Sequence, residues 1–281
     1  ESVIIGVALY EQFQILKRNW FPILVSTVLG STFSIIILYI LGKVFGLPDD
    51  IFHATLPKSV TTAIALDIAS KNVIMKLRDN IKDRILILDG AMGTMIQGYN
   101  LTEKDFRGNL ELLQMLNYQG NNDMLNLSRP DIIEDIHRRY LEVGADIIST
   151  NTFSAQRISQ VDYHMESFSR DIAYAGAKLA RKCADEYSTA DKPRFVAGSI
   201  GPTNKTCSMS PDVSDPAKRD LTYDALFDAY SEQVAAMIEG GIDAVLIETI
   251  FDTLNAKVAI DASLSEMKKA GIDLPIMLSV T

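Results

Sequence analysis

Over residues 75–281, short apolar runs alternate with longer stretches in which apolar residues recur at helical spacing. The apolar runs predict strands at 85–89, 146–150, 195–199, 244–248 and 276–280. The periodic stretches predict helices such as 131–143, 167–187 and 225–239. Glycines stand where these and later helices should end, at Gly144, Gly240, Gly241 and Gly271. Glycine readily adopts the left-handed conformation that follows many helices.

Apolar strands that alternate with helices form βαβ units and pair in parallel. The repeats therefore predict an α/β fold, and five of them suggest a (βα)8 TIM barrel truncated after about five strands. A doubly wound sheet is the alternative. Such a sheet usually carries a Gly-x-Gly-x-x-Gly turn after its first strand, whereas the turn at residues 89–94 reads DGAMGT.

The pattern before residue 75 is different. Residues 19–42 contain no charged side chain, and basic residues flank this run on both sides. A helix needs about 20 apolar residues to cross a bilayer core, and Trp20 and Tyr39 stand near the expected interfaces. The run predicts a membrane-spanning helix, with a buried helix of a water-soluble protein as the alternative. Residues 51–70 are half polar and fit either a broken membrane helix or a surface amphipathic helix.

Charge divides the chain at the same place. Residues 1–74 hold equal numbers of basic and acidic residues, so the net charge of −9 lies entirely in the remainder. We therefore expect a membrane-type, all-α helical domain at 1–74 and a separate domain at 75–281, with Met75 as an original start residue. An acidic surface argues against nucleic acid as a partner. Two cysteines in 281 residues fit the reducing cytoplasm for the second domain.

Polar residues follow several predicted strands: Asp89 with Gly90, Asn151 with Thr152, residues 201–204, and Glu248 with Thr249. In a barrel, the active site lies at the carboxyl ends of the strands. Asp89 alone could be a helix cap or loop organiser. Two carboxylates from separate strands, Asp89 and Glu248, could jointly hold an amine, and the backbone N–H groups after Asp89 could face a carboxylate. This combination would bind an amino acid.

The remaining candidate chemistry is sparse. Cys183 stands in a helical pattern, where we expect a packed residue, and Cys207 stands in the loop after the third predicted strand. His53, His137 and His164 are scattered and are expected to be surface or core residues. None of these residues has the spacing of a metal site.

Two resemblances to known families add to these expectations. The runs LYEQFQILKRNWFPILVSTVLGS and LPKSVTTAIALDIA, within residues 1–71, resemble the LrgB-like family of antiholin-type membrane proteins. That resemblance implies a fragment of a membrane transporter or autolysis regulator, associated with a membrane through residues 19–42.

Residues 76–281 contain ILDGAMGTMIQ, GNNDMLNLSRPDII, GADIISTNTF, GPTNKT, SPDVSDPA and LIETIFDTLNAK. These motifs resemble the homocysteine-binding domain of the cobalamin-dependent methionine synthases, within the homocysteine S-methyltransferase family. The resemblance implies a (βα)8 barrel in which zinc, held by three cysteines, activates the homocysteine thiol. The thiol then takes a methyl group from methylcobalamin, which is recharged from 5-methyltetrahydrofolate. Further cobalamin- and folate-binding domains are the implied partners.

By the same resemblance, Asp89 and Glu248 hold the homocysteine amine, Gly90 and Ala91 meet its carboxylate, and Asn151 lines the pocket. The zinc cysteines of the family stand in motifs that would follow Thr281. The chain starts at Glu1 and stops at Thr281 within an apolar run. We therefore expect an inactive fragment, joined to the LrgB-like segment by a frameshift, an assembly error or a gene truncation.

Overall fold

The computed structural model describes residues 77–110, 116–189 and 191–279. The chain divides into two compact units, Glu1–Asn72 and Val73–Thr281, and every described residue belongs to the second. The expected membrane helix at 19–42 and the half-polar segment at 51–70 lie outside the described residues. Within the described part of the chain, no helix has the length and apolar character needed to cross a membrane.

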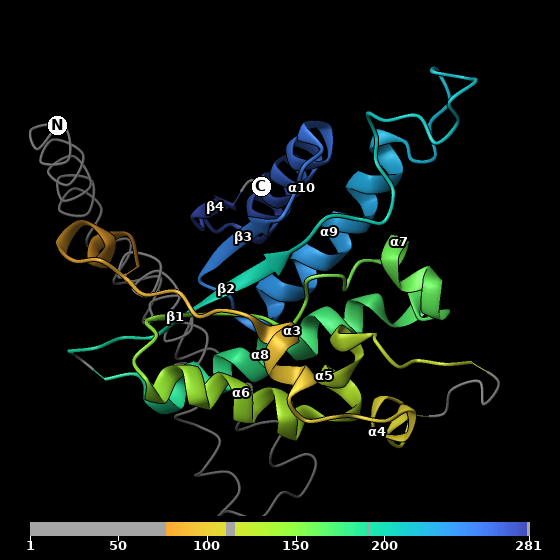
Figure 1. The fold of residues 1–281 in the computed structure, drawn as a ribbon. Coiled ribbons are helices and arrows are strands. Elements are labelled where there is room, and N and C mark those ends of the chain that lie inside the picture. Colours follow the sequence, from red (N-terminus) through yellow and green to blue (C-terminus); the bar gives the residue numbers. More distant parts are fainter. Residues whose placement is uncertain (1–76, 111–115, 190, 280–281) are drawn as a thin grey trace, which may run out of the picture. The chain divides into compact units, whose positions relative to one another are not determined.

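Four parallel strands form one sheet in the order β1-β2-β3-β4 (Figure 1). They are β1 (Ile147–Ser149), β2 (Phe195–Ile200), β3 (Ala244–Glu248) and β4 (Ile276–Ser279). Long helices precede and connect them: α6 (Pro130–Glu142), α8 (Ser169–Tyr187), α9 (Tyr223–Gly240) and α10 (Thr253–Ala270). The last four predicted strands and the three predicted helices are confirmed, with bounds that differ by at most two residues.

The first predicted strand, at 85–89, is reduced to a single parallel bridge between Leu88 and Ile147. Ile147 donates its N–H to the Ile87 carbonyl at 3.0 Å and accepts the Asp89 N–H at 2.9 Å. The next rung of a parallel ladder would join the Ser149 N–H to the Asp89 carbonyl. The Asp89 side-chain carboxylate takes that N–H instead, and the ladder ends there.

Among the described residues, seven short helices lie in the connections, all of them between residue 89 and β2. They are α3 (Met92–Gln97), α4 (Glu103–Arg107), η1 (Asn122–Met124), α5 (Leu125–Ser128), α7 (Arg157–Gln160), η2 (Val161–Tyr163) and η3 (Glu166–Phe168). Helical periodicity cannot reveal elements this short, because one or two turns do not repeat a pattern. They shape the loops that follow Asp89 and β1.

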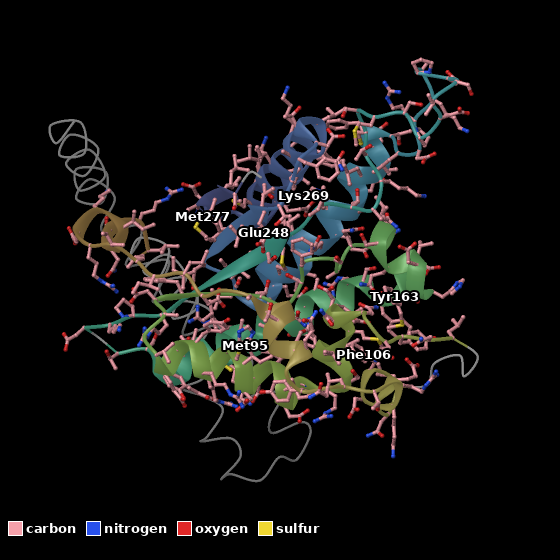
Figure 2. The ribbon with its side chains drawn as sticks, in the orientation of Figure 1. Met95, Phe106, Tyr163, Glu248, Lys269 and Met277 are labelled. Carbon is pink, nitrogen blue, oxygen red and sulfur yellow. The ribbon has the colours of Figure 1, made fainter. Side chains whose placement is uncertain are left out.

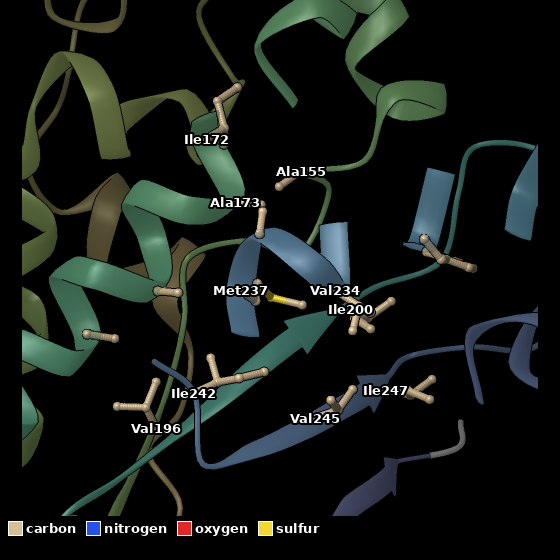
Figure 3. Close-up of a cluster of buried hydrophobic side chains, with 14 of the residues drawn as sticks. Ala155, Ile172, Ala173, Val196, Ile200, Val234, Met237, Ile242, Val245 and Ile247 are labelled. Atoms are coloured by element: carbon tan, nitrogen blue, oxygen red, sulfur yellow. The ribbon is translucent and has the colours of Figure 1, made fainter. Parts of the chain in front are cut away.

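The strands bury apolar residues on both faces, as parallel sheets do. On the helix-facing side, Val196, Val245 and Ile247 pack with Ile172 of α8 and Met237 of α9 in the main core (Figure 3). The opposite side forms a smaller cluster of Leu77, Ile147, Phe195, Ala197, Ala244 and Leu246. Neighbouring residues along each strand alternate strictly between the two clusters. We call the side of the smaller cluster the inner side of the sheet, and the alternation determines which residues at each strand end lie on it.

Part of the inner side is uncovered by the described residues. A helical segment at 77–83 lies against it, but Leu88, which pairs with Ile147 of the smaller cluster, is 42% exposed. Within the described part of the chain, β4 pairs with β3 alone.

The predicted helix stops are confirmed. Gly241 ends α9 at a φ of 98°, and Gly271 ends α10 at a φ of 68°. Gly144 follows α6 at a φ of 109°. These left-handed conformations turn the chain sharply into β3, β4 and β1, so each strand starts directly behind the helix that precedes it.

His137 lies in the core between α6 and its neighbours and is fully buried. Neither ring nitrogen has a hydrogen-bond partner among the described residues. Burial lowers its pKa to about 4, an effect that Glu134 offsets in part. The expectation of a core histidine is confirmed here, whereas His164 is exposed and His53 lies outside the described residues.

We predict that His137→Leu removes an acid sensitivity of the fold. The pKa is lower in the folded chain than the usual 6.5, so stability is complete above about pH 6.5 and is lost as the pH falls toward 4. At pH 4.5 the variant should gain about 2 kcal/mol over the wild type, relative to their difference at pH 7.5. Denaturant unfolding at both pH values measures this. A constant difference at the two pH values would contradict the prediction.

Candidate functional site

A cavity of about 670 Å³ lies at the carboxyl ends of the strands, among the loops that follow them. All five residues predicted to bind substrate line it: Asp89, Gly90, Ala91, Asn151 and Glu248. Glu248 ends β3, and Tyr163 on the far wall comes from η2 in the loop after β1 (Figure 2). The structure therefore gathers residues that are about 160 positions apart in the sequence.

Asp89 is held by β1. Its two carboxylate oxygens each accept the Ser149 N–H at 3.0 Å, and Oδ1 also accepts the Ser149 hydroxyl at 2.6 Å. Burial raises the pKa of Asp89 to about 7. The bonds from Ser149 oppose this increase, and the nearby charge of Glu248 adds to it. Asp89 can therefore change its charge near neutral pH.

Glu248 is held by β2 in a similar way. Its Oε1 accepts the Ser199 hydroxyl at 2.5 Å. The next residue, Thr249, has a φ of 59°, which is unusual for a β-branched side chain and costs about 1–2 kcal/mol. Its N–H still donates to the Ser279 carbonyl at 3.0 Å. Backbone strain directly after Glu248 is typical of a functional strand end.

Gly90 and Ala91 lead into α3, which begins at Met92. The first N–H groups of a helix have no carbonyl partner within it. In α3 the earliest such bond runs from Met95 to the Ala91 carbonyl. The N–H groups just after Asp89 therefore stand beside the cavity as hydrogen-bond donors.

Asn151 also holds two loops together, a structural role that its position in the sequence did not indicate. Its amide nitrogen donates to the Asn122 carbonyl at 2.8 Å and to Asn126 Oδ1 at 3.1 Å. Its own carbonyl accepts Asn126 Nδ2 at 2.7 Å. These bonds tie the loop after β1 to the loop around η1, so the side-chain oxygen is the atom through which Asn151 can meet a ligand.

Asp123 was not among the predicted site residues, yet it lines the same cavity and is 6% exposed. It accepts the Ser154 N–H at 3.1 Å. Burial raises its pKa to about 7, and backbone hydrogen bonds from Ser154 and its own N–H limit the rise. The GNND motif carried the only signal for it, since a polar run before a helix also fits a plain cap.

In the loop at 201–222, residues 201–204 were expected to contribute polar groups, and Pro202, Thr203 and Asn204 do line the cavity. Beyond them the loop projects away from the sheet, past the beginning of α9 (Figure 1). Two residues at the start of α10 anchor its base. Asp252 accepts the Ser208 N–H at 3.0 Å and its hydroxyl at 2.7 Å, and Asn255 Oδ1 accepts the Cys207 N–H at 3.0 Å.

The cavity is strongly acidic. Four carboxyl groups line it, from Asp89, Asp123, Asp162 and Glu248, and its described lining contains no Lys, Arg or His. Unpaired buried carboxylates are costly, so such a cavity favours a ligand that brings a positive charge.

Sequence comparison assigns this part of the chain. The family model for homocysteine S-methyltransferase matches residues 86–281, about 70% of the chain. The chain belongs to the homocysteine S-methyltransferase family. The matched range contains β1 to β4 and every residue that lines the cavity.

Two solved structures of the homocysteine methyltransferase MmuM from Escherichia coli share the fold. The metallated form matches with a TM-score of 0.53 and 18% identity, over 72% of this chain and 65% of the other. The oxidized form matches with a TM-score of 0.53 and 19% identity, over 72% of this chain and 64% of the other. The chain thus spans slightly less than two thirds of the length of these methyltransferases.

A second family model, for the LrgB-like family, matches residues 2–102. Both suspected segments are therefore confirmed by family models, and the two matches overlap at 86–102. In the structure, Leu88 of this overlap pairs with β1 and Asp89 lines the cavity.

Neither Cys183 nor Cys207 lines the cavity that contains Asp89 and Glu248. Cys183 is packed in α8, as expected, where burial raises its pKa to about 11. Cys207 is buried and its thiol contacts the Thr222 carbonyl at 3.8 Å. Among the described residues, no group of three His, Cys, Asp or Glu side chains could hold a metal ion.

We predict that Asp89→Asn stabilises the ligand-free chain above pH 7. The Asp89 pKa is about 7 in the folded chain and about 3.9 in an unfolded one. The folded state is therefore penalised progressively as the pH rises from 4 to 7, and the penalty is constant above that. The variant should gain on the order of 1–2 kcal/mol at pH 8 and little at pH 4.5. Equal gains at both pH values, measured by denaturant unfolding, would refute it.

Proposed function

We propose that residues 75–281 bind homocysteine, as the homocysteine-binding part of a cobalamin-dependent methionine synthase. One observation carries the proposal: Asp89 and Glu248, from different strands, line one acidic cavity beside the unbonded N–H groups that start α3. A cationic amine donates to both carboxylates, and the N–H groups donate to the carboxylate of the ligand. The side chain of the amino acid then extends into the remainder of the cavity.

Within this site, Asp89 and Glu248 hold the amine, the N–H groups of Gly90 and Ala91 meet the carboxylate, and the Asn151 oxygen contacts the ligand at the edge. Each charge-assisted hydrogen bond contributes about 1.5–3 kcal/mol. The cavity of about 670 Å³ is large for homocysteine alone, so it leaves room for a second reactant near the thiol.

We further propose that the sheet is part of a (βα)8 TIM barrel of which about five strands belong to this chain. The strand order β1-β2-β3-β4 has no reversal, and a reversal is the mark of a doubly wound sheet. Leu88 pairs with β1 and marks a strand that precedes β1 in the chain, which brings the number of strands to five. A barrel also places the active site where the cavity lies.

Zinc and cobalamin are the cofactors that the proposal implies, but the described residues do not fit a zinc site. Cys183 is packed in α8 and Cys207 is bonded in the loop at 201–222, so their thiols serve the fold. The described residues therefore support recognition of the amino-acid group without activation of the thiol. We propose that this chain transfers no methyl group alone, and that cobalamin- and folate-binding domains are its partners in a cytoplasmic enzyme.

The match of residues 2–102 to the LrgB-like family favours a second function. On that reading, the segment at 1–74 is a fragment of a membrane transporter or autolysis regulator, with residues 19–42 in the membrane. It draws on a different part of the chain, so both assignments can hold. Membrane fractionation of cells that express the full chain, before and after deletion of residues 19–42, tests it.

We predict that the full chain binds homocysteine more tightly as the pH rises through about 7, because Asp89 ionises there. Asp89→Asn should weaken binding about tenfold or more at pH 8 and reduce the pH dependence to the part that Asp123, whose pKa is also about 7, contributes. Glu248→Gln should weaken binding by a similar factor. Isothermal titration calorimetry measures both, with Lys269→Gln on the exposed side of α10 as a control. Wild-type affinity in either carboxylate variant would refute the amine site.

We predict that the full chain forms no methionine from homocysteine and methylcobalamin, even with added zinc. A thiol with an ordinary pKa near 8.5 is mostly protonated at pH 7, and the thiolate is the nucleophile. Detection of methionine by mass spectrometry, against a reaction without protein, tests this. Methionine above that background would show that a described residue activates the thiol, and Cys207→Ser would be the first variant to examine.

A further inference from the structure

Asp89 and Glu248 each accept a hydrogen bond from a serine on a neighbouring strand. Ser149 of β1 bonds Asp89 through its hydroxyl at 2.6 Å, and Ser199 of β2 bonds Glu248 at 2.5 Å. Neither serine was among the predicted site residues, and both line the cavity. Because the two serine–carboxylate pairs have the same arrangement, we infer that they have the same role.

The strand register places the serines between the carboxylates. Ser149 lies beside Ala197, two residues before Ser199, and Ser199 lies beside Leu246, two residues before Glu248. Side chains two residues apart point to the same side of a strand. Ser149, Ser199 and Glu248 therefore share the inner side of the sheet, and the Asp89 carboxylate joins them through its hydrogen bonds to Ser149.

The second serine is itself fixed by buried groups. The Ser199 N–H donates to Thr150 Oγ1 at 2.9 Å, and its carbonyl accepts Thr152 Oγ1 at 2.8 Å. Gln233 of α9 donates to the same carbonyl at 3.3 Å and to the Thr152 carbonyl at 2.6 Å. This buried network determines the position of the Ser199 backbone, and the backbone determines where its hydroxyl meets Glu248.

We propose that Ser149 and Ser199 are positioning residues that aim the Asp89 and Glu248 carboxylates at one ammonium group. The inference rests on the proposed homocysteine site and names the residues that shape it. A hydroxyl that donates to a carboxylate oxygen restricts the rotation of that carboxylate and leaves its other lone pairs for the ligand. Neither serine contacts the reacting thiol in this arrangement, so neither is a catalytic residue.

The two serines have distinguishable effects, because they act on different groups. Burial and the charge of Glu248 raise the pKa of Asp89, and the bonds from Ser149 oppose the increase. Loss of the Ser149 hydroxyl therefore moves the ionisation of Asp89 to higher pH. Loss of the Ser199 hydroxyl frees the Glu248 side chain and leaves the bonds between Ser149 and Asp89 in place.

The test measures homocysteine binding to the full chain by calorimetry between pH 6 and 9. Ser149→Ala should move the midpoint of the binding profile upward by roughly one pH unit and weaken binding at pH 7 about tenfold. Ser199→Ala should weaken binding about fivefold at every pH without moving the midpoint. Ser149→Thr and Ser199→Thr keep the hydroxyl and should recover most of the affinity.

Ser263→Ala is the matched control, since Ser263 is fully buried in α10 and bonds the Ala259 carbonyl at 2.7 Å, away from the cavity. It should lose stability comparably and keep wild-type binding. The positioning role is overturned if Ser149→Ala leaves the midpoint unchanged, or if Ser199→Ala binds as tightly as the control.

A second measurement separates this inference from the proposed function. If the wild-type chain fails to bind homocysteine at any pH, the proposed function fails. The ionisation of Asp89 is then followed in the ligand-free chain by NMR of 13C-labelled aspartate, with Asp89→Asn to assign the signal. An upward shift of its midpoint in Ser149→Ala supports the role of Ser149, and an unchanged midpoint refutes it.

Discussion

The parallel ladder that runs from Leu88 through β4 is the constraint on which the site depends. Parallel strands bring their carboxyl ends to one edge of a sheet, so polar residues that end separate strands are gathered however far apart they stand in the sequence. The register then decides which of them share a side. In this chain it places Ser149, Ser199 and Glu248 on the inner side, opposite the side on which α8, α9 and α10 complete the main core.

The same edge carries an energetic conflict. The apolar clusters on both sides of the sheet lower the local dielectric around the strand ends, which strengthens hydrogen bonds and makes uncompensated charge costly. Asp89 and Asp123 show the cost, because burial raises the pKa of each to about 7. Hydroxyl and backbone donors relieve only part of it. The buried carboxylates lower the stability of the fold when the site is empty, and a cationic ligand offsets this cost. Functional sites commonly lower the stability of a protein in this way.

Much of the fold was predictable from the sequence, because fully buried strands produce continuous apolar runs and glycines mark helix ends. The runs at 195–199 and 244–248 became β2 and β3 with almost no change. The run at 85–89 is similarly apolar but forms only a bridge, because the Asp89 side chain accepts the Ser149 N–H that the next bond of the ladder would use. No local pattern can report a partner 60 residues away.

The site was predictable in part for the same reason. Asp89 and Glu248 are exceptional residues at strand ends, and their convergence follows from topology alone. Ser149 and Ser199 are ordinary residue types at ordinary positions, and their importance comes from the register between strands. Asn151 lines the cavity, as its strand-end position indicated, but its hydrogen bonds to two other parts of the chain were not predictable from that position.

The acidity of the cavity also determines how an amino acid can lie in it. Its described lining has four carboxyl groups and no basic side chain, so the carboxylate of a ligand is repelled from every part of the cavity except where backbone dipoles oppose the repulsion. The N–H groups at the start of α3 supply such dipoles. In the proposed site, with the amine between Asp89 and Glu248, one orientation places the ligand carboxylate at α3, and the side chain then extends into the remainder of the cavity. Orientation in the proposed site therefore comes from one short helix and two carboxylates, without a salt bridge from the described lining to the ligand carboxylate.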